Sequence, residues 1–388
     1  MCSKVVLFSV LACFAAVATT ASCSGVVVCY YGAWSIWRSS SGHYGVSDLP
    51  VDLCTHIVYS FIAPTAEGGI YFTDAEDTVN GKSNKMDDFV ALKQNNSDLK
   101  LMVAMGGWTP ASTNFTIVVN NDTLRATLIN TMVSFVEEHD LDGVDLDWEY
   151  PAQRGGADSD KEQFVVLVKE LKAALGSKLL TAAVAVTQSN IDLSYNVTEL
   201  NKYLDYFHLM NYDYHGSWET VTGVVAPLYA QLTDAAGTNL NVNHSVYTWI
   251  ENGASPSKLV LGLAAYGKTF TLTSLDNTST GAPASGAGVA GPFVGEAGSY
   301  SYAEICSDQA ANATAWSITE VTGNYVYANK DTFWVGYDNA NTIYAKAQYA
   351  KEMGLAGIMY WAADLDDFNG LCGSTYPLIK AGISGYNA

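Results

Sequence analysis

The chain has 388 residues, of which 49% are hydrophobic and 15% are charged, with 39 acidic side chains against 19 lysines and arginines. A chain this apolar is not disordered, and its length exceeds a typical domain while still fitting a single α/β barrel. The formal net charge of −20 argues against nucleic acid and against an anionic membrane as partners, because both are bound by clustered Lys and Arg. Neutral or cationic ligands are expected instead.

The first 21 residues are typical of a secretion signal. Lys4 precedes an apolar stretch from Val5 to Val17, and small residues suitable for a signal peptidase follow. A membrane anchor is the alternative, but about 13 apolar residues fall short of the ~20 that a spanning helix needs. We therefore expect a signal peptide over residues 1–21, with cleavage possible as late as residue 23, and a secreted, extracellular protein.

The cysteines and glycosylation sequons agree with secretion. Cleavage after Ala21 leaves five cysteines, whereas cleavage after Cys23 leaves an even set suited to an oxidising compartment. That set consists of Cys29, Cys54, Cys306 and Cys372. Seven Asn-x-Ser/Thr sequons lie at Asn95, Asn114, Asn121, Asn196, Asn243, Asn277 and Asn312.

Eight short apolar runs rich in strand-forming residues recur along the chain, with helical or loop segments between them. They cover residues 26–31, 56–62, 99–105, 143–149, 179–186, 206–212, 259–266 and 357–361. This alternation predicts βα units around a parallel sheet. Two helices are clear from apolar residues at helical spacing: Leu124, Leu128, Met132 and Phe135 in the first, and Phe164, Leu167, Leu171 and Leu175 in the second.

The pattern favours an α/β fold of the (β/α)₈ TIM-barrel type, whose active site lies at the C-terminal ends of the strands. A doubly wound open sheet is the alternative. About 90 residues separate the seventh run from the eighth, and residues 270–300 are rich in Gly, Ser, Ala and Thr. Because one helix needs far fewer residues, we expect a barrel over residues 22–269 and 334–388, with an inserted subdomain over residues 270–333.

The segment DGVDLDWEYP, residues 142–151, places Asp145, Asp147 and Glu149 at alternate positions. On a strand such residues share one face, at about 6.6 Å for each pair of positions, and here that face points toward the barrel axis. Burying three acids opposes folding and raises their pKa values. Such an arrangement usually reflects a need for proton transfer or metal binding.

Three interpretations of this acidic strand compete. A solvated edge strand conflicts with the regular alternation of Val144, Leu146 and Trp148. A divalent-metal site lacks a second acidic or histidine cluster to complete the ligand shell, so we expect no metal and no cofactor. Glycoside hydrolysis fits best, with Glu149 as general acid at the C-terminal end of the strand.

The segment also resembles the DxxDxDxE signature of family 18 glycoside hydrolases, the chitinases, and the resemblance to animal members of the acidic mammalian chitinase and chitotriosidase kind covers nearly the whole mature chain. The supporting segments resemble the family's first, third, sixth and eighth strands: CYYGAWSIWR (29–38), MVAMGGW (102–108), LMNYDYHGSW (209–218) and IMYWAADLDDFNG (358–370). SYAEIC (301–306) is similar to part of the small α+β insertion of the deep-groove branch. Ala104 stands where the family often has Ser, and we expect this change to tune Asp145 rather than to abolish activity.

The resemblance implies a secreted chitinase that hydrolyses β-1,4-linked N-acetylglucosamine polymers and oligomers with retention, using the acetamido group of the substrate. Glu149 would protonate the glycosidic oxygen and later activate water. Asp147 would hold the acetamido N–H and raise the pKa of the acid, while Asp145 would share a proton with Asp147. Tyr212 would hydrogen-bond the acetamido oxygen, and Asp213 would help to position that sugar.

The resemblance further implies a substrate-binding groove lined by aromatic residues, because sugars present flat apolar faces. Trp361 would form its floor. The other substrate-binding residues would be Tyr31, Trp34, Phe61, Gly107, Trp108, Tyr150, Met210, Asp213, Trp218, Tyr266, Lys268 and Met359. The remaining tryptophans, Trp37, Trp148, Trp249, Trp316 and Trp334, are assigned to packing.

The expected disulfides and partners also follow from the resemblance. Cys29 would pair with Cys54, and Cys306 with Cys372. Chitin and chito-oligosaccharides would be the partners of a monomer, with no C-terminal chitin-binding module. Two alternatives remain: a non-catalytic chitin-binding lectin or growth-factor-like protein on the same fold, and an endo-β-N-acetylglucosaminidase. Glu149 favours an enzyme, because non-catalytic relatives usually lack an acid there.

Overall fold

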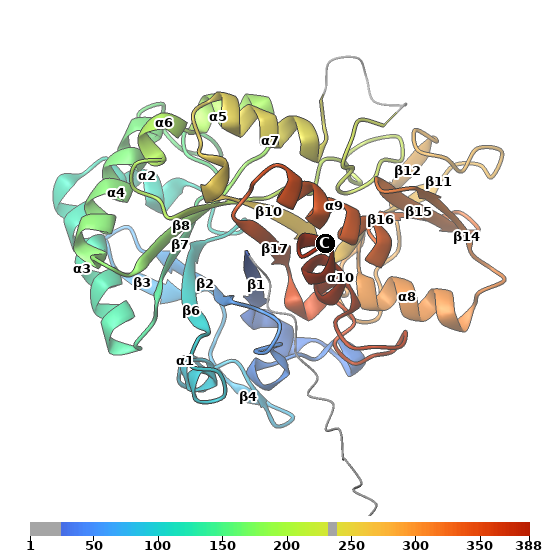
Figure 1. The fold of residues 1–388 in the computed structure, drawn as a ribbon, viewed down its shortest axis with the longest axis horizontal. Helices are drawn as coiled ribbons and strands as arrows, with labels where there is room; N and C mark the ends of the chain where they lie inside the picture. Colours follow the sequence, from blue (N-terminus) through green and yellow to red (C-terminus); the bar gives the residue numbers. More distant parts are fainter. Residues whose placement is uncertain (1–24, 232–238) are drawn as a thin grey trace, which may run out of the picture.

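Eight parallel strands close into a barrel in the computed structural model (Figure 1). The structure describes residues 25–231 and 239–388, so the expected signal peptide and Cys23 lie outside the described residues. The barrel strands are β1 (Val26–Gly32), β2 (His56–Pro64), β6 (Lys100–Gly106), β7 (Gly143–Asp147), β8 (Leu179–Val184), β9 (Tyr206–Leu209), β10 (Leu259–Ala264) and β17 (Gly357–Trp361). Strand β1 pairs with both β17 and β2, which closes the sheet. All eight expected strands are confirmed, and the open doubly wound sheet is excluded.

Helices cover the outside of the barrel. They are α1 (Met86–Val90), α2 (Thr113–Val119), α3 (Asp122–Glu138), α4 (Asp160–Leu175), α5 (Gln188–Ser194), α6 (Val197–Leu200), α7 (Val242–Glu251), α9 (Ala340–Glu352) and α10 (Pro377–Tyr386). The two helices predicted from apolar spacing are α3 and α4, whose residues Leu128, Met132, Leu167 and Leu171 are fully buried. The Asn121 side chain caps α3 by accepting the first free backbone N–H groups. No helix in the described ranges is both long and apolar enough to span a bilayer.

A second, antiparallel sheet forms the lobe at one side of the barrel (orange in Figure 1). It contains β11 (Tyr266–Leu272), β12 (Ala284–Ala287), β13 (Ser299–Ser301), β14 (Ser317–Val321), β15 (Tyr325–Lys330) and β16 (Phe333–Tyr337), with helix α8 (Tyr302–Ala311) beside it. The expected limits of the insertion were residues 270 and 333. The first limit falls inside β11, and the second leaves most of β16 outside the expected insertion. Short strands β3 (Ile70–Phe72), β4 (Thr78–Val79) and β5 (Lys82–Ser83) lie in the segment after β2.

Two disulfides tie the chain together at the pairs that the resemblance implies. Cys29 of β1 is bonded to Cys54, which precedes β2. Cys306 of α8 is bonded to Cys372, which follows β17, so this bond fastens the second sheet's helix to the barrel. The second bond closes a loop across a sequence separation of 66 residues, and such cross-links stabilise chiefly by restricting the unfolded chain.

A buried ion pair joins the second sheet to α9. Asp338 follows β16 and accepts a hydrogen bond from Lys346 at 2.5 Å, and both side chains are 1% exposed. Lys346 also donates to the carbonyl of Ala226, and Thr342 donates to Asp338 at 2.8 Å. Because each charge has a full set of partners, the pair can remain buried despite the loss of hydration.

Replacing Lys346 alone should destabilise the protein strongly, because Asp338 would stay buried without its counter-charge. We expect Lys346→Met to lower the free energy of unfolding by about 3–5 kcal/mol, and the double variant with Asp338→Asn to recover much of that loss. Urea unfolding followed by circular dichroism measures both. Lys202→Met, which removes an exposed pair with Glu199, is the control and should change little. A Lys346→Met variant as stable as this control would contradict the expectation.

Candidate active site

The carboxylates along strand β7 and just after it become more accessible to solvent toward the C-terminal end of the strand. Asp145 is fully buried, Asp147 is 3% exposed, and Glu149, just beyond the strand's C-terminal end, keeps a partly exposed surface. Asp145 contacts side chains from three other barrel strands, so the acidic face of β7 points into the barrel. The two inner acids therefore lie in the interior, and Glu149 lies where solutes can reach it.

Asp145 is held by hydrogen bonds from around the barrel. The Tyr30 hydroxyl donates to Asp145 at 2.7 Å, and the Thr181 hydroxyl donates to its other oxygen at 2.5 Å. His208 Nδ1 lies 2.8 Å from the Tyr30 oxygen and 3.3 Å from Asp145. Ala104 of β6 lies directly beside Asp145 and has no hydroxyl to donate to it. Thr181, on the strand at the other side, β8, supplies a hydroxyl instead.

Burial and like charge raise the pKa values of the outer two acids. Loss of hydration raises the pKa of Asp147 well above its ordinary range, and the nearby charges of Glu149 and Asp145 raise it further. One oxygen of Asp147 has no hydrogen-bond partner among the described residues. Burial also raises the pKa of Glu149 to about 7, against the opposing effects of the Tyr150 hydrogen bond and the Arg154 charge. Glu149 is therefore protonated in mildly acidic solution, as a general acid must be.

Arg154, one of three arginines in the chain, is a site residue that the sequence reasoning missed. Its guanidinium lies 3.5 Å from the centre of the exposed Trp108 ring and donates to the carbonyls of Trp108 and Glu149 at 2.8 and 3.0 Å. Buried Asp160 fixes the loop that carries it by accepting from Ala157 N at 2.8 Å, among other donors. In the sequence, only the position of Arg154, five residues after Glu149, pointed to this role.

Aromatic rings from separate strands meet above the acids. Trp361, at the end of β17, lies 5.7 Å from Phe61 of β2 in a stacked arrangement, and Phe61 stacks in turn on Trp34 at 5.9 Å. Gly107 has a φ of +87°, and a Cβ there would lie 2.7 Å from the Phe61 ring. Trp108 and Trp218 are 61% and 63% exposed. The structure thus presents flat apolar surfaces around Glu149.

Polar residues that follow β9 and β10 surround the same strand ends. Tyr266 donates to Asp213 at 2.6 Å, and the Lys268 ammonium lies 3.2 Å from the same carboxylate. The Tyr212 hydroxyl points to the sulfur of Met359 at 3.8 Å, which is a weak acceptor. The structure therefore brings these expected site residues together. Met210 and Tyr150 are partly buried, and both pack against the barrel core.

Two assignments need correction. Tyr31 is fully buried, and its ring contacts Tyr44 and Tyr59 at 6.0 and 5.7 Å, outside the barrel interior. Because alternate strand residues face opposite ways, Tyr30 is the tyrosine that points inward, 5.5 Å from Trp361. Trp37, assigned to packing, is 50% exposed, whereas Trp148, Trp249, Trp316 and Trp334 are buried as expected.

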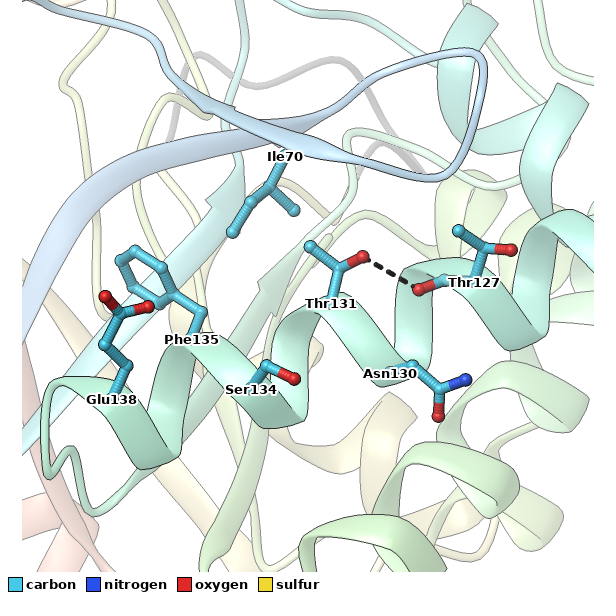
Figure 2. Close-up of a pocket in the computed structure, with 7 residues that line it drawn as sticks. All are labelled: Ile70, Thr127, Asn130, Thr131, Ser134, Phe135 and Glu138. Atoms are coloured by element: carbon cyan, nitrogen blue, oxygen red, sulfur yellow. Dashed lines mark hydrogen bonds between the residues drawn. The ribbon is translucent and has the colours of Figure 1, made fainter.

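A hollow of about 490 Å³ lies between α3 and β3, and none of the β7 acids lines it (Figure 2). It is lined by Ile70, Thr127, Asn130, Thr131, Ser134, Phe135 and Glu138. None of these is an expected site residue, and the Thr131 hydroxyl is already bonded to the Thr127 carbonyl at 2.9 Å. We therefore place the chemistry at the strand ends.

A barrel with a protonatable acid at the end of an acidic strand, surrounded by exposed aromatic rings, is the arrangement of an enzyme that cleaves glycosidic bonds. The model of the glycosyl hydrolases family 18 matches residues 26–366. The chain is 39% identical to an endochitinase of Manduca sexta over 367 residues, which cover 91% of this chain and 66% of that protein. The chain therefore belongs to family 18 of the glycosyl hydrolases.

Solved structures agree with this membership. The crystal structure of Ostrinia furnacalis Group IV chitinase in complex with allosamidin superposes with a TM-score of 0.88 at 39% identity, covering 92% of this chain and 97% of that one. Human YKL-39, described as a pseudo-chitinase with retained chitooligosaccharide binding, has a TM-score of 0.85 at 32% identity, covering 94% and 100%. The fold is thus common to enzymes and to a protein described as a pseudo-chitinase.

The charge of Arg154 should set the upper pH limit of activity. Glu149 must be protonated to act as an acid, so activity falls as pH rises through its pKa of about 7. Arg154→Gln removes a charge that lowers this pKa, and the alkaline limb of the kcat/KM profile should move to higher pH. Arg154→Lys keeps the charge and is the control. A profile that stays in place with Gln, or that moves equally with Lys, would show that the charge does not act on Glu149.

Proposed function

We propose that the protein is a secreted chitinase that hydrolyses chitin and its oligomers with retention of anomeric configuration, through the acetamido group of the substrate. The observation that carries the proposal is the acidic strand, with Glu149 at its accessible end and a pKa of about 7. The names of the Manduca endochitinase and of the Ostrinia chitinase bound to allosamidin support the same substrate class. Two disulfides favour an oxidising compartment.

The first step transfers the proton of Glu149 to the glycosidic oxygen, which leaves as an alcohol. The acetamido carbonyl oxygen of the sugar whose glycosidic bond breaks forms a bond to the anomeric carbon of that same sugar, which gives an oxazolinium ion. Substrate participation replaces an enzyme nucleophile.

Two side chains have free hydrogen-bonding capacity that suits the acetamido group. The unpartnered oxygen of Asp147 can accept from the acetamido N–H, which increases the nucleophilicity of the carbonyl. Among the described residues, the Tyr212 hydroxyl has only the weak acceptor Met359 sulfur as a partner, so it can turn to the acetamido oxygen. Both contacts would gain strength as charge develops on the acetamido group.

The second step is hydrolysis of the oxazolinium ion. Glu149, now a carboxylate, takes a proton from water as the water oxygen bonds to the anomeric carbon. The bond between the anomeric carbon and the acetamido oxygen breaks, which opens the oxazolinium ring and restores the acetamido group. Glu149 is then protonated again. Two inversions give net retention. The aromatic rings of Trp361, Trp108 and Trp218 would hold the sugar chain by stacking on its apolar faces.

A non-catalytic chitin-binding protein is the second candidate, and the likeness to human YKL-39 is the observation that favours it. Glu149 argues against it, because the residue supplies an acid of suitable pKa at the strand end. Purified protein that binds chito-oligosaccharides but cleaves none of them between pH 3 and pH 9 would favour this candidate.

Glu149→Gln should remove nearly all turnover while leaving binding in place. The amide keeps the size of the side chain but can neither donate the proton nor activate water, so we expect a loss of at least about 100-fold in kcat. Hydrolysis of chito-oligosaccharides measures kcat, and isothermal titration calorimetry measures binding. A variant that cleaves at the wild-type rate would assign the acid to another residue.

Retention can be tested separately on the first-formed product. Proton NMR during early hydrolysis should show the β-anomer at the newly formed reducing end, before mutarotation mixes the two forms. Initial α-anomer would mean that water attacks directly, and the acetamido route would be wrong even if Glu149 is the acid.

A further inference from the structure

Asn243 is one of the seven sequon asparagines, and the fold leaves its amide nitrogen open. It lies in the first turn of α7, and its Oδ1 accepts a hydrogen bond from the Tyr349 hydroxyl at 3.0 Å. Asn243 is partly exposed, and its Nδ2 is neither buried nor bonded to another described residue. The bond to Tyr349 thus orients the side-chain amide and keeps Nδ2 available for a covalent attachment.

The other six sequons lack this combination. Three of them use the amide nitrogen inside the fold, as a donor to other residues at 2.8, 3.2 and 2.6 Å: Asn114, Asn196 and Asn312. The remaining three are exposed, but none is followed four positions later by an aromatic residue: Asn95, Asn121 and Asn277. Asn243 is followed at that distance by Tyr247.

Two exposed tyrosines flank Asn243. Tyr247 lies about one turn later on the same helix and is 46% exposed. Because helical side chains lean toward the N-terminus of the helix, the Tyr247 ring covers the surface next to Asn243. Tyr229 is 49% exposed, and its ring meets the Tyr349 ring edge to face at 6.4 Å. Burial raises the pKa of Tyr349, and the nearby Tyr247 and Tyr229 raise it further, so the three tyrosines form one cluster.

The segment that carries Tyr229 is fixed at two points. The Leu228 carbonyl accepts from the backbone N–H of Asn243 at 3.0 Å, which ties the segment to α7. The backbone N–H of Tyr229 donates to Asn324 Oδ1 at 2.9 Å, in the turn between β14 and β15. The Tyr229 ring is therefore held in place before any sugar contacts it, which lowers the entropy cost of stacking.

We propose that Asn243 carries an N-linked glycan whose first N-acetylglucosamine packs against Tyr247 and Tyr229. This site rests on the proposed function, because only a secreted chain meets the oligosaccharide transferase. In the transfer, Nδ2 loses one proton and bonds to C1 of the first sugar of a lipid-linked pyrophosphate oligosaccharide. The bond between C1 and the phosphate oxygen breaks, and the lipid pyrophosphate leaves with its electron pair. The flat apolar face of the attached sugar then lies on the tyrosine rings.

The transfer precedes the folding of this region. Ser245, the third residue of the sequon, is fully buried and donates to the Val186 carbonyl at 2.5 Å. Because the sequon is read through this hydroxyl, the sugar is attached before α7 packs onto the segment after β8. The finished fold then encloses Ser245 and leaves Asn243 at the surface.

The test uses the full chain secreted from cells that attach only high-mannose glycans. Enzymatic release of the glycans in ¹⁸O-labelled water converts each occupied asparagine to labelled aspartate, and mass spectrometry should find Asn243 among them. Endoglycosidase H, applied to a separate sample, trims each glycan to its first N-acetylglucosamine. By calorimetry, the trimmed protein should melt about 1–3 °C above the equally trimmed Asn243→Gln variant, the shift expected for one stacked sugar. In a Tyr247→Ala background this difference should disappear.

Comparing Asn243→Gln in both backgrounds cancels any loss of the Tyr349 hydrogen bond. Tyr71→Ala is the matched control, because Tyr71 is 44% exposed but lies on β3, and it should keep the melting difference.

An unoccupied Asn243 in a protein whose other sequons carry glycans would overturn the site while leaving the proposed function intact. An occupied Asn243 with the same melting difference in the Tyr247→Ala background would overturn the packing on the tyrosines. If the chain stays inside the cell with no sequon occupied, the secretion in the proposed function itself fails.

Discussion

The burial of acidic side chains along β7 is the constraint on which the rest of the site depends. Each carboxylate loses hydration and is repelled by the next, so the barrel must compensate the charge or leave a proton in place. At the inner end, Tyr30 and Thr181 donate hydrogen bonds to Asp145, and His208 Nδ1 lies 3.3 Å from the same carboxylate. Farther out the compensation is incomplete, and the pKa values of Asp147 and Glu149 rise. Both outer acids therefore keep a proton more readily than a free carboxyl does, and Glu149 is the one that solutes can reach.

The barrel could be predicted from the sequence because parallel strands buried on both faces appear as short continuous apolar runs. The limits of the second sheet could not. Strand β10 ends at Ala264 and β11 begins at Tyr266, with only Ala265 between them. No glycine, proline or polar cluster marks the change from a barrel strand to a strand of the other sheet, so the apolar run 259–266 extends across it. The closure of the barrel between its first and last strands, β1 and β17, likewise needs three-dimensional pairing that no local pattern contains.

At the site, residues within one motif were predictable and residues that meet across the fold were not. The alternation of Asp145, Asp147 and Glu149 is local, whereas the partners of Asp145 come from β1, β8 and β9 and depend on strand register. The same limit explains the choice of Tyr31 over Tyr30, since two adjacent tyrosines do not reveal which one faces inward. Arg154 was missed because its contacts depend on a loop that Asp160 folds back toward Trp108.

The barrel and the second sheet contribute to different properties of the enzyme. The acids and their hydrogen-bond partners lie on barrel strands, so the protonation of Glu149 is set by the barrel together with the Arg154 loop. Strand β11 of the lobe supplies Tyr266 and Lys268, which contact Asp213 after β9 at 2.6 and 3.2 Å. Asp364 pairs with Arg38, and Cys372 is bonded to Cys306 of α8, so the segment after β17 fastens both the segment after β1 and the lobe to the barrel. Sequence changes in the lobe therefore leave the hydrogen bonds of Asp145 in place and can act on Glu149 through Asp213, whose charge raises the pKa of Glu149.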